Sequence, residues 1–321
     1  MRKRIRLHQV RIGMFVEDLE CTPGVTDPPF SPFLIKAQSD VARIMKSSAM
    51  SVVIDTRRGI DTGEAGPLVT VLDPERFEKS LRGRFSPDEI REARQSVEKT
   101  VPYIRNLFGE ARMNGVFAVD SAHAAVEQVM ASAVSNTGAL VGILRLKNAD
   151  EASFLHSLAV SALMIGFGRR LELNDADIQL LAFGGLVHDL GKMLMPKGIL
   201  LKEGELSIRE MAVIRRHPEL GYEMLKGIEG ISQTVLDICL HHHERWNGTG
   251  YPSGLAGKTI PHAARVAAIC DVYEAMTTIR PYKRAWSPQD TIDMMRRSEG
   301  HFDPVLLRMF VSNMINAGVL R

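Results

Sequence analysis

Cysteine is scarce in this 321-residue sequence. Cys21, Cys239 and Cys270 are odd in number and widely spaced, and no two form a Cys-x-x-Cys pair. This pattern argues against a disulfide framework and against a thiolate zinc site. It is typical of a protein from a reducing cytoplasm, which is the location that we expect.

The sequence also lacks long hydrophobic runs and a strong charge of one sign. The longest apolar run, around residues 158–167, is too short to span a bilayer. Residues 1–7 are basic, but charged and alternating sequence follows where a signal peptide has a continuous apolar segment. The formal net charge of +2 favours neither membranes nor polymeric nucleic acid as partners, so any anion must bind at a local patch.

The chain contains three consecutive regions that differ in residue pattern and composition. Residues 1–65 hold short alternating and β-branched runs broken by turn residues at 22–24 and 27–29, which predicts a small β-containing domain. Residues 66–119 predict a linker and a connector helix that begins at Ser86-Pro87, with Pro102 interrupting its pattern. Residues 120–321 predict an all-helical domain, so the fold class is mainly α.

Periodic apolar positions predict separate helices within the third region. The expected segments are 120–135, 155–171, 176–187, 205–216, 218–226, 231–243, 263–276 and 288–297.

Histidine is the most informative residue type in this region. A single histidine is usually solvated or satisfied in a core, so the prediction depends on several histidines sharing the apolar faces of different helices. His156 begins an apolar stripe at helical spacing and is therefore expected to point inward. His242 and His243 continue the apolar stripe of their own helix, whereas His241 lies above Asp237 towards its polar side.

Aspartates next to helix ends complete the pattern. His188 and Asp189 follow Gly184 and Gly185, two glycines that predict close approach by a partner helix. A vicinal His-Asp pair can direct both side chains at one metal centre, and a buried aspartate without a cation would be costly. Asp271 ends a face of small residues on a later helix.

These side chains predict a metal centre with nitrogen and oxygen donors and no sulfur. Such donors suit iron, manganese, nickel, cobalt or zinc, and disfavour an all-oxygen magnesium or calcium cage. Two ions about 3.5–4 Å apart would let a bridging water ionise near neutral pH and attack phosphorus in line. His217 precedes Pro218 at a helix start, where its side chain can point inward. The predicted metal ligands are therefore His156, His188, Asp189, His217, His242, His243 and Asp271.

In this order the residues resemble the HD-GYP branch of the HD phosphohydrolase superfamily, over about residues 147–315. The run 188–192 (HDLGK) resembles the defining HD element. More specific are 242–252 (HHERWNGTGYP), 280–283 (RPYK) and 300–304 (GHFDP). The N-terminal region resembles a short domain of unknown function often found before HD-GYP domains in bacteria, which implies regulation, dimerisation or partner choice.

The resemblance implies a phosphodiesterase that hydrolyses cyclic di-GMP to linear pGpG, GMP or both. It implies that two divalent ions, with iron or manganese favoured, are bridged by Asp189. One ion would be held by His156, His188 and Asp271, and the other by His217, His242 and His243. Lys192 would face a phosphate oxygen or the leaving group. Tyr251, Arg280 and Lys283 would meet the ligand, because two phosphates and two flat bases need cationic donors and aromatic surfaces.

The chain departs from the family pattern at two positions. Asn247 stands where the family commonly has aspartate, and we expect the Asn-Gly turn to keep the loop geometry. Ala152 stands where some members carry a glutamate that binds a third metal, with Glu151 one residue off that face. The sequence therefore favours two ions.

Three alternatives to this function stay open. The first is a phosphodiesterase that prefers another cyclic dinucleotide, such as cyclic GMP-AMP. The second is a nucleotide or alarmone phosphohydrolase, which the segments 248–252 and 280–283 disfavour. The third is a non-catalytic protein that binds cyclic di-GMP or docks on diguanylate cyclases, which the complete ligand set disfavours. The native metal and a homodimer are not decided by the sequence.

Overall fold

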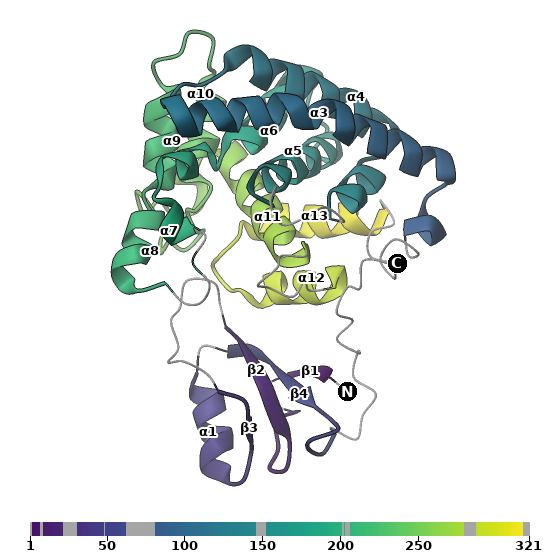
Figure 1. The fold of residues 1–321 in the computed structure, drawn as a ribbon, viewed down its shortest axis with the longest axis vertical. Coiled ribbons are helices and arrows are strands. Elements are labelled where there is room, and N and C mark those ends of the chain that lie inside the picture. The colour runs from purple at the N-terminus through teal and green to yellow at the C-terminus, as the bar shows by residue number, and fades with distance from the viewer. Residues whose placement is uncertain are drawn as a thin grey trace. The chain divides into compact units, whose positions relative to one another are not determined.

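A computed structural model of the chain describes residues 2–6, 9–21, 31–47, 49–61, 81–145, 152–200, 202, 206–278 and 287–316. Contacts divide the chain into two compact units, one of Met1–Val71 with Gly204–Ser207 and one of the remaining residues. The first unit contains a small sheet and the second is helical, which confirms the predicted fold class (Figure 1). None of the described helices combines the length and the apolarity needed to cross a bilayer.

The N-terminal unit is a four-stranded antiparallel sheet with one helix. The strands β1 (Arg2–Arg6), β2 (Phe15–Cys21), β3 (Phe33–Leu34) and β4 (Ala49–Asp55) lie in the order β1-β4-β2-β3. Alternation along the strands places Ile5, Val16 and Ile54 in a small core with Ile44 of helix α1 (Gln38–Lys46). The sequence reading did not predict α1, and the turns expected at 22–24 and 27–29 lie outside the described residues.

The helical unit begins with α3 (Pro87–Asn114), which packs along α4 (Val119–Leu144) (Figure 1). Ser86 caps α3 as expected: its hydroxyl accepts from the Glu89 amide at 3.3 Å, and the Glu89 carboxylate accepts from the Ser86 amide at 2.7 Å. The expected interruption at Pro102 is wrong, because α3 continues through it. Pro102 is exposed, so water can reach the carbonyl of Glu98 that has lost its helical partner.

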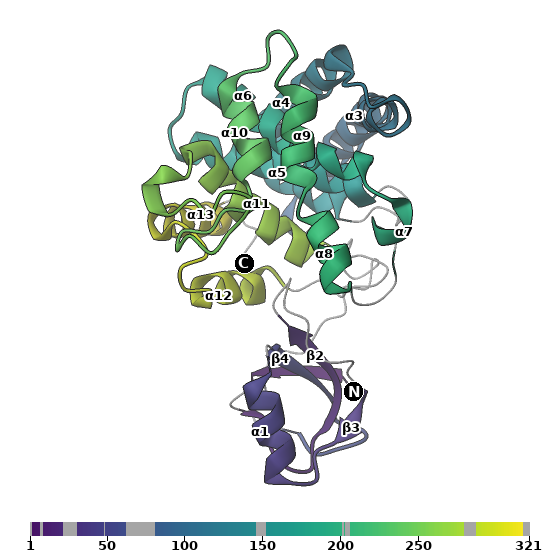
Figure 2. The same ribbon diagram turned by 90° about the vertical axis from the view of Figure 1, so that its left-hand side faces the viewer.

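The rest of the unit is a succession of helices joined by loops, seen from a second side in Figure 2. The extension of α4 beyond residue 135 and the last helix were not predicted. The elements are α5 (Ala152–Arg170), α6 (Asp175–Val187), η3 (Leu190–Leu194), α7 (Lys197–Leu200), α8 (Ile208–Ile214), α9 (His217–Leu225), α10 (Gln233–His241), η4 (Gly257–Thr259), α11 (His262–Thr277), α12 (Pro288–Arg297) and α13 (Pro304–Asn316).

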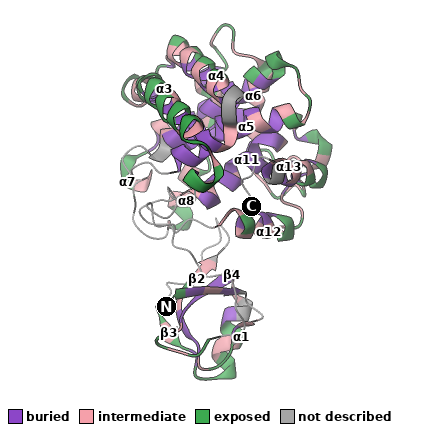
Figure 3. Ribbon diagram, turned by 90° about the vertical axis from the view of Figure 1, so that its right-hand side faces the viewer, coloured by how far each residue is buried: buried purple, intermediate pink, exposed green. Residues whose placement is uncertain are grey.

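Helix α5 lies at the centre of this unit and packs against α4, α6, α11 and α13. Its described residues are mostly buried, as the purple ribbon in Figure 3 shows. Two glycines of α6 permit close contact, as predicted. A Cβ on Gly184 would lie 2.2 Å from Ile238 Cδ1 of α10, and one on Gly185 would lie 2.9 Å from Ser161 Cα of α5. The end of α6 is thereby held between α5 and α10.

Candidate metal centre

The predicted ligands come from different helices and meet inside the helical unit. His156 lies in α5, His188 caps the C-terminus of α6, and Asp189 follows it. His217 begins α9, and Asp271 lies in α11. His242 caps the C-terminus of α10 and precedes His243. All are buried except His243, which is half-buried.

Donor atoms of these residues form two groups that share Asp189. His156, His188 and Asp189 have donor atoms within 4.8 Å of one another, as do Asp189, His217, His242 and His243. Asp189 Oδ2 lies 3.6 Å from His156 Nε2 and 3.4 Å from His188 Nε2. Asp189 Oδ1 lies 3.2 Å from His217 Nε2 and 3.9 Å from His242 Nε2. The two oxygens of one carboxylate therefore face different groups, as bridging of two cations requires.

Asp271 adjoins the first of these groups. Its Oδ1 lies 3.0 Å from His156 Nε2 and 3.9 Å from His188 Nε2. The group on this side of Asp189 therefore combines two imidazoles with two carboxylates. On the other side, the donor group found among the described residues is three imidazoles with Asp189.

The Nδ1 atoms of four of these histidines point away from the cluster, and their hydrogen bonds determine which tautomer each imidazole adopts. A carbonyl or carboxylate oxygen can only accept, so an Nδ1 bonded to it carries the hydrogen and leaves the Nε2 lone pair free in the neutral ring. His156 Nδ1 faces the carboxylate of Glu274. The other such bonds run from His188 Nδ1 to Gly185 O at 2.8 Å, from His217 Nδ1 to Ile214 O at 2.8 Å, and from His242 Nδ1 to Cys239 O at 2.9 Å.

This arrangement fits a divalent cation. His217 Nε2 and His242 Nε2 lie 3.1 Å apart, although both rings already donate through Nδ1. Two facing lone pairs repel unless a cation lies beside them, and ligands about 2.1 Å from one ion are separated by about 3.0–3.4 Å. Among the described atoms, His188 Nε2 and Asp189 Oδ1 are also buried without a hydrogen-bond partner. A bound ion would satisfy both.

Burial and mutual repulsion control the protonation of the second group. Burial lowers the pKa of His217, and burial with neighbouring imidazoles holds the pKa of His242 well below its usual value. Burial lowers the pKa of His243 to about 3. Burial alone would raise the pKa of Asp189, but Lys192 and His188 outweigh it and keep that pKa well below the usual range. The group of His217, His242, His243 and Asp189 therefore keeps neutral imidazoles and a charged carboxylate, the forms that bind metal.

These shifts predict that the metal-free protein loses stability in mild acid. His217, His242 and His243 have lowered pKa values when folded, so below about pH 6.5 the unfolded chain binds more protons than the folded chain. His156, whose pKa the Glu274 and Asp271 carboxylates raise to about 9 against the effect of burial, is protonated in both states there and adds no slope.

Each histidine that stays neutral should remove about 1.4 kcal/mol of unfolding free energy per pH unit between about pH 6 and pH 5. Urea unfolding in the presence of a chelator at pH 7, 6 and 5 measures this slope. The same titration with saturating metal is the control, because displaced ions make the loss steeper. Constant stability down to pH 5 would contradict the assignment of neutral buried imidazoles.

Two of the four residues expected to contact substrate, Lys192 and Tyr251, are described by the structure, and both lie beside the cluster. Lys192 Nζ donates to Asp189 Oδ2 at 2.6 Å and is 28% exposed. Tyr251 stacks on His243 with ring centroids 4.8 Å apart, and the Arg215 guanidinium lies 5.3 Å from the Tyr251 ring centroid. Arg280 and Lys283 lie outside the described residues, so their roles stay predictions.

The loop that carries Tyr251 is organised by Glu244, a residue that the sequence reading missed. Glu244 is buried and accepts from the Ser253 amide at 2.7 Å and from the Leu255 amide at 3.1 Å. Asn247 keeps a turn, as expected: its side-chain oxygen accepts from the Thr249 amide at 3.1 Å. The signal for Glu244 was its place in the run 242–252, in which no role was expected for this residue.

Two other histidine-related outcomes differ from expectation. His241, predicted to face solvent, has a side chain only 13% exposed, and Glu244 at the start of the next loop lies 3.7 Å from its Nδ1. Glu274, also missed, lies beside His156 and one helical turn beyond Asp271. Its spacing of three residues from Asp271 places both on one face of α11, which was a readable signal.

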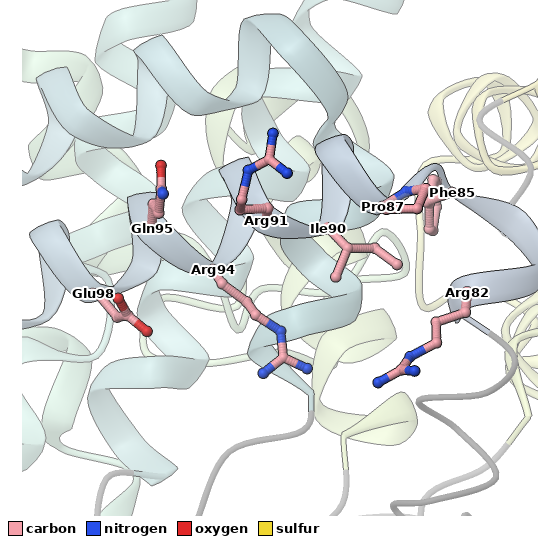
Figure 4. A pocket seen from close by; sticks show the side chains of 8 residues that line it. All are labelled: Arg82, Phe85, Pro87, Ile90, Arg91, Arg94, Gln95 and Glu98. Atoms are coloured by element: carbon pink, nitrogen blue, oxygen red, sulfur yellow. The ribbon is translucent and has the colours of Figure 1, made fainter.

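A separate hollow lies along the beginning of α3 (Figure 4). This cavity of about 570 Å³ shares no described lining residue with the histidine cluster. Arg82 and Arg94 point to one side of the helix and Arg91 to the other (Figure 4). The described lining offers no imidazole for a metal; it consists of Arg82, Phe85, Pro87, Ile90, Arg91, Arg94, Gln95 and Glu98.

A helical domain with a vicinal His-Asp pair between histidines from neighbouring helices defines the class of HD proteins. Comparison with family models agrees: residues 129–306 match the HD domain, and residues 2–122 match a domain of unknown function, DUF3391. The chain belongs to the HD domain family, and its resemblance to the HD-GYP branch with a short N-terminal domain is confirmed.

Individual relatives support this membership. The chain is 40% identical to the cyclic di-GMP phosphodiesterase PA4108 of Pseudomonas aeruginosa, over 97% of this chain and 76% of the relative. It is 35% identical to the cyclic di-GMP phosphodiesterase response regulator RpfG of Xanthomonas campestris pv. campestris, over 51% of this chain and 44% of the relative. Bd1817 of Bdellovibrio bacteriovorus, an HDGYP protein of known structure, shares the fold with a TM-score of 0.58 and 18% identity, over 98% of this chain and 99% of Bd1817.

Proposed function

We propose that this protein is a metal-dependent phosphodiesterase that hydrolyses cyclic di-GMP to linear pGpG, GMP or both. The observation that carries the proposal is the Asp189 carboxylate, whose two oxygens face two separate groups of imidazoles. The 40% identity to a cyclic di-GMP phosphodiesterase over most of the chain supports the substrate class.

The residues in the cluster would hold two divalent ions. His156, His188 and Asp271 would hold one, His217, His242 and His243 the other, and Asp189 would bridge them. Iron or manganese suits these nitrogen and oxygen donors best, and nickel, cobalt and zinc remain compatible. When bound, such a pair supplies an activated water near neutral pH and neutralises charge on phosphoryl oxygens.

The chain's own side chains would orient the substrate. Lys192, with its ammonium on Asp189 and part of its surface exposed, would meet a phosphate oxygen or the leaving group. Tyr251 would offer an aromatic surface beside His243. Arg280 and Lys283 would pair with the phosphates or guanines, as in the family pattern.

The remaining parts of the proposal concern organisation and partners. Residues 1–65 would form a regulatory domain, 66–119 a linker and connector helix, and 120–321 the catalytic domain. Helix α3, which belongs to the proposed connector, packs along α4 of the helical unit. A cytoplasmic location is supported by the free buried thiols of Cys239 and Cys270. A diguanylate cyclase or another signalling protein is the proposed class of protein partner, and homodimerisation is the proposed assembly.

A product assay tests the proposed function. Anaerobically purified protein, analysed for metal and then incubated with cyclic di-GMP, should release pGpG or GMP, and a chelator should stop the reaction. Cyclic GMP-AMP in a parallel reaction measures base preference, and its faster hydrolysis would reassign the substrate. Intact cyclic dinucleotides after incubation with fully metallated protein would refute the phosphodiesterase proposal.

A further inference from the structure

Glu274 is a buried carboxylate with no assigned role. It lies in α11, is 1% exposed, and follows Asp271 by one helical turn. One carboxylate oxygen accepts from His156 Nδ1, and the other accepts from the Thr278 hydroxyl. Glu274 thus touches an imidazole of the cluster from behind, on the side opposite to the Nε2 atom that faces Asp189 and Asp271.

The group that accepts the Nδ1 hydrogen of His156 differs in charge from the groups that accept the Nδ1 hydrogens of its neighbours. His188, His217 and His242 donate their Nδ1 hydrogens to neutral backbone carbonyls. Both kinds of acceptor select the tautomer, but the full negative charge of Glu274 makes the opposite nitrogen of His156 a stronger donor to a cation than a neutral carbonyl does. Carboxylates in this position behind metal-binding histidines change metal affinity about 10–100-fold.

Glu274 also makes the two sides of the cluster electrostatically unequal. The side with His156 and His188 has the carboxylates of Asp189 and Asp271 in front and Glu274 behind. Among the described residues, the donor group of His217, His242 and His243 contains one carboxylate, the shared Asp189, while Asp271 acts on His243 through space. A divalent ion at the first side therefore meets more negative charge inside a buried, weakly screened environment.

We propose that Glu274 is a positioning residue that makes the His156 side the tighter of two cation positions, so that this side fills first. The proposal rests on the proposed two-ion centre and adds the order of loading to it. It requires no contact between Glu274 and the substrate or the reacting atoms.

The substitution Glu274→Gln distinguishes the effect of the negative charge from the effect of side-chain size. The glutamine keeps the size of the side chain and an oxygen that accepts from His156 Nδ1, but it removes the negative charge. Asp303→Asn is the matched control, because Asp303 is also a buried carboxylate of this unit. Its partners are Arg265 at 2.6 Å and backbone amides, and none is a residue of the cluster.

The experiment is a titration of metal-free protein with Mn²⁺, in which the EPR signal of the free ion reports each binding step. The unmodified chain should bind two ions in distinct steps. Glu274→Gln should weaken the tighter step about 10–100-fold and leave the other nearly unchanged. Asp303→Asn should retain both steps, even if it lowers thermal stability. His156→Ala should remove the same step that Glu274→Gln weakens.

Other outcomes separate failure of this inference from failure of the proposed function. If the unmodified chain binds two ions and Glu274→Gln binds them with the same affinities, Glu274 has no positioning role. Equal weakening of both steps, together with the same effect in Asp303→Asn, would show a merely structural role. If the unmodified chain binds no Mn²⁺, Fe²⁺ or Zn²⁺, the two-ion centre itself is refuted.

Discussion

Asp189→Ala should abolish metal retention and reduce cyclic di-GMP hydrolysis by about 10³-fold or more, the scale seen when one member of a catalytic unit is removed. Asp189 is the residue shared by both donor groups, and its two oxygens face His188 and His217 from opposite sides. Without it, the imidazoles have no bridging charge, and the Asp271 carboxylate lies next to His156 and His188. Metal analysis after desalting and a product assay measure the two effects.

Two further variants make this result interpretable. Asp189→Asn preserves the size of the side chain, so a folded protein without metal would show that charge, and not packing, is responsible. Asp175→Ala, at an exposed position at the start of α6, should change stability by no more than about 0.5 kcal/mol and retain both metal and activity. Hydrolysis by a metal-free Asp189→Ala protein would contradict the proposed mechanism. Unchanged signalling in cells that carry this variant would favour a scaffold role.

Gly191→Ala should destabilise the helical unit by about 1–3 kcal/mol and also weaken metal binding. A Cβ at Gly191 would lie 2.0 Å from the His217 carbonyl oxygen and 2.6 Å from the Gly221 amide nitrogen. Both contacts are with backbone, so η3 and α9 must separate to accommodate one methyl group. Because His217 begins α9, this separation also displaces His217 from Asp189.

Gly198→Ala is the matched control for this prediction. Gly198 lies in the short helix α7, and a Cβ there would have no neighbour within 4 Å. Alanine should therefore be neutral or stabilising by up to about 1 kcal/mol. Thermal unfolding with and without metal measures both variants. Equal stability and equal metal affinity for Gly191→Ala and Gly198→Ala would show that the contact of η3 with α9 does not position His217.

The sequence predicted the inward face of each helix where a strong local pattern exists. The apolar stripe that contains His242, the glycines before His188 and the proline after His217 are local features, and the structure places these histidines in one cluster. Local rules failed where a distant residue or solvent decides the outcome. Pro102 does not end α3, because that face is exposed to water, and His241 is mostly buried, with Glu244 of the following loop beside it.

Composition and periodicity by themselves determined the mainly helical fold and predicted the set of nitrogen and oxygen donors, because each depends on residue type and short-range spacing. Only the tertiary structure decided which oxygen of Asp189 faces which histidines. It also decided that Glu274, 118 residues further along the chain, accepts the hydrogen bond from Nδ1 of His156. Such pairings depend on how α5, α6, α9, α10 and α11 pack against one another. Helical spacing indicates which face of a helix is buried, but it carries no information about the neighbour on that face.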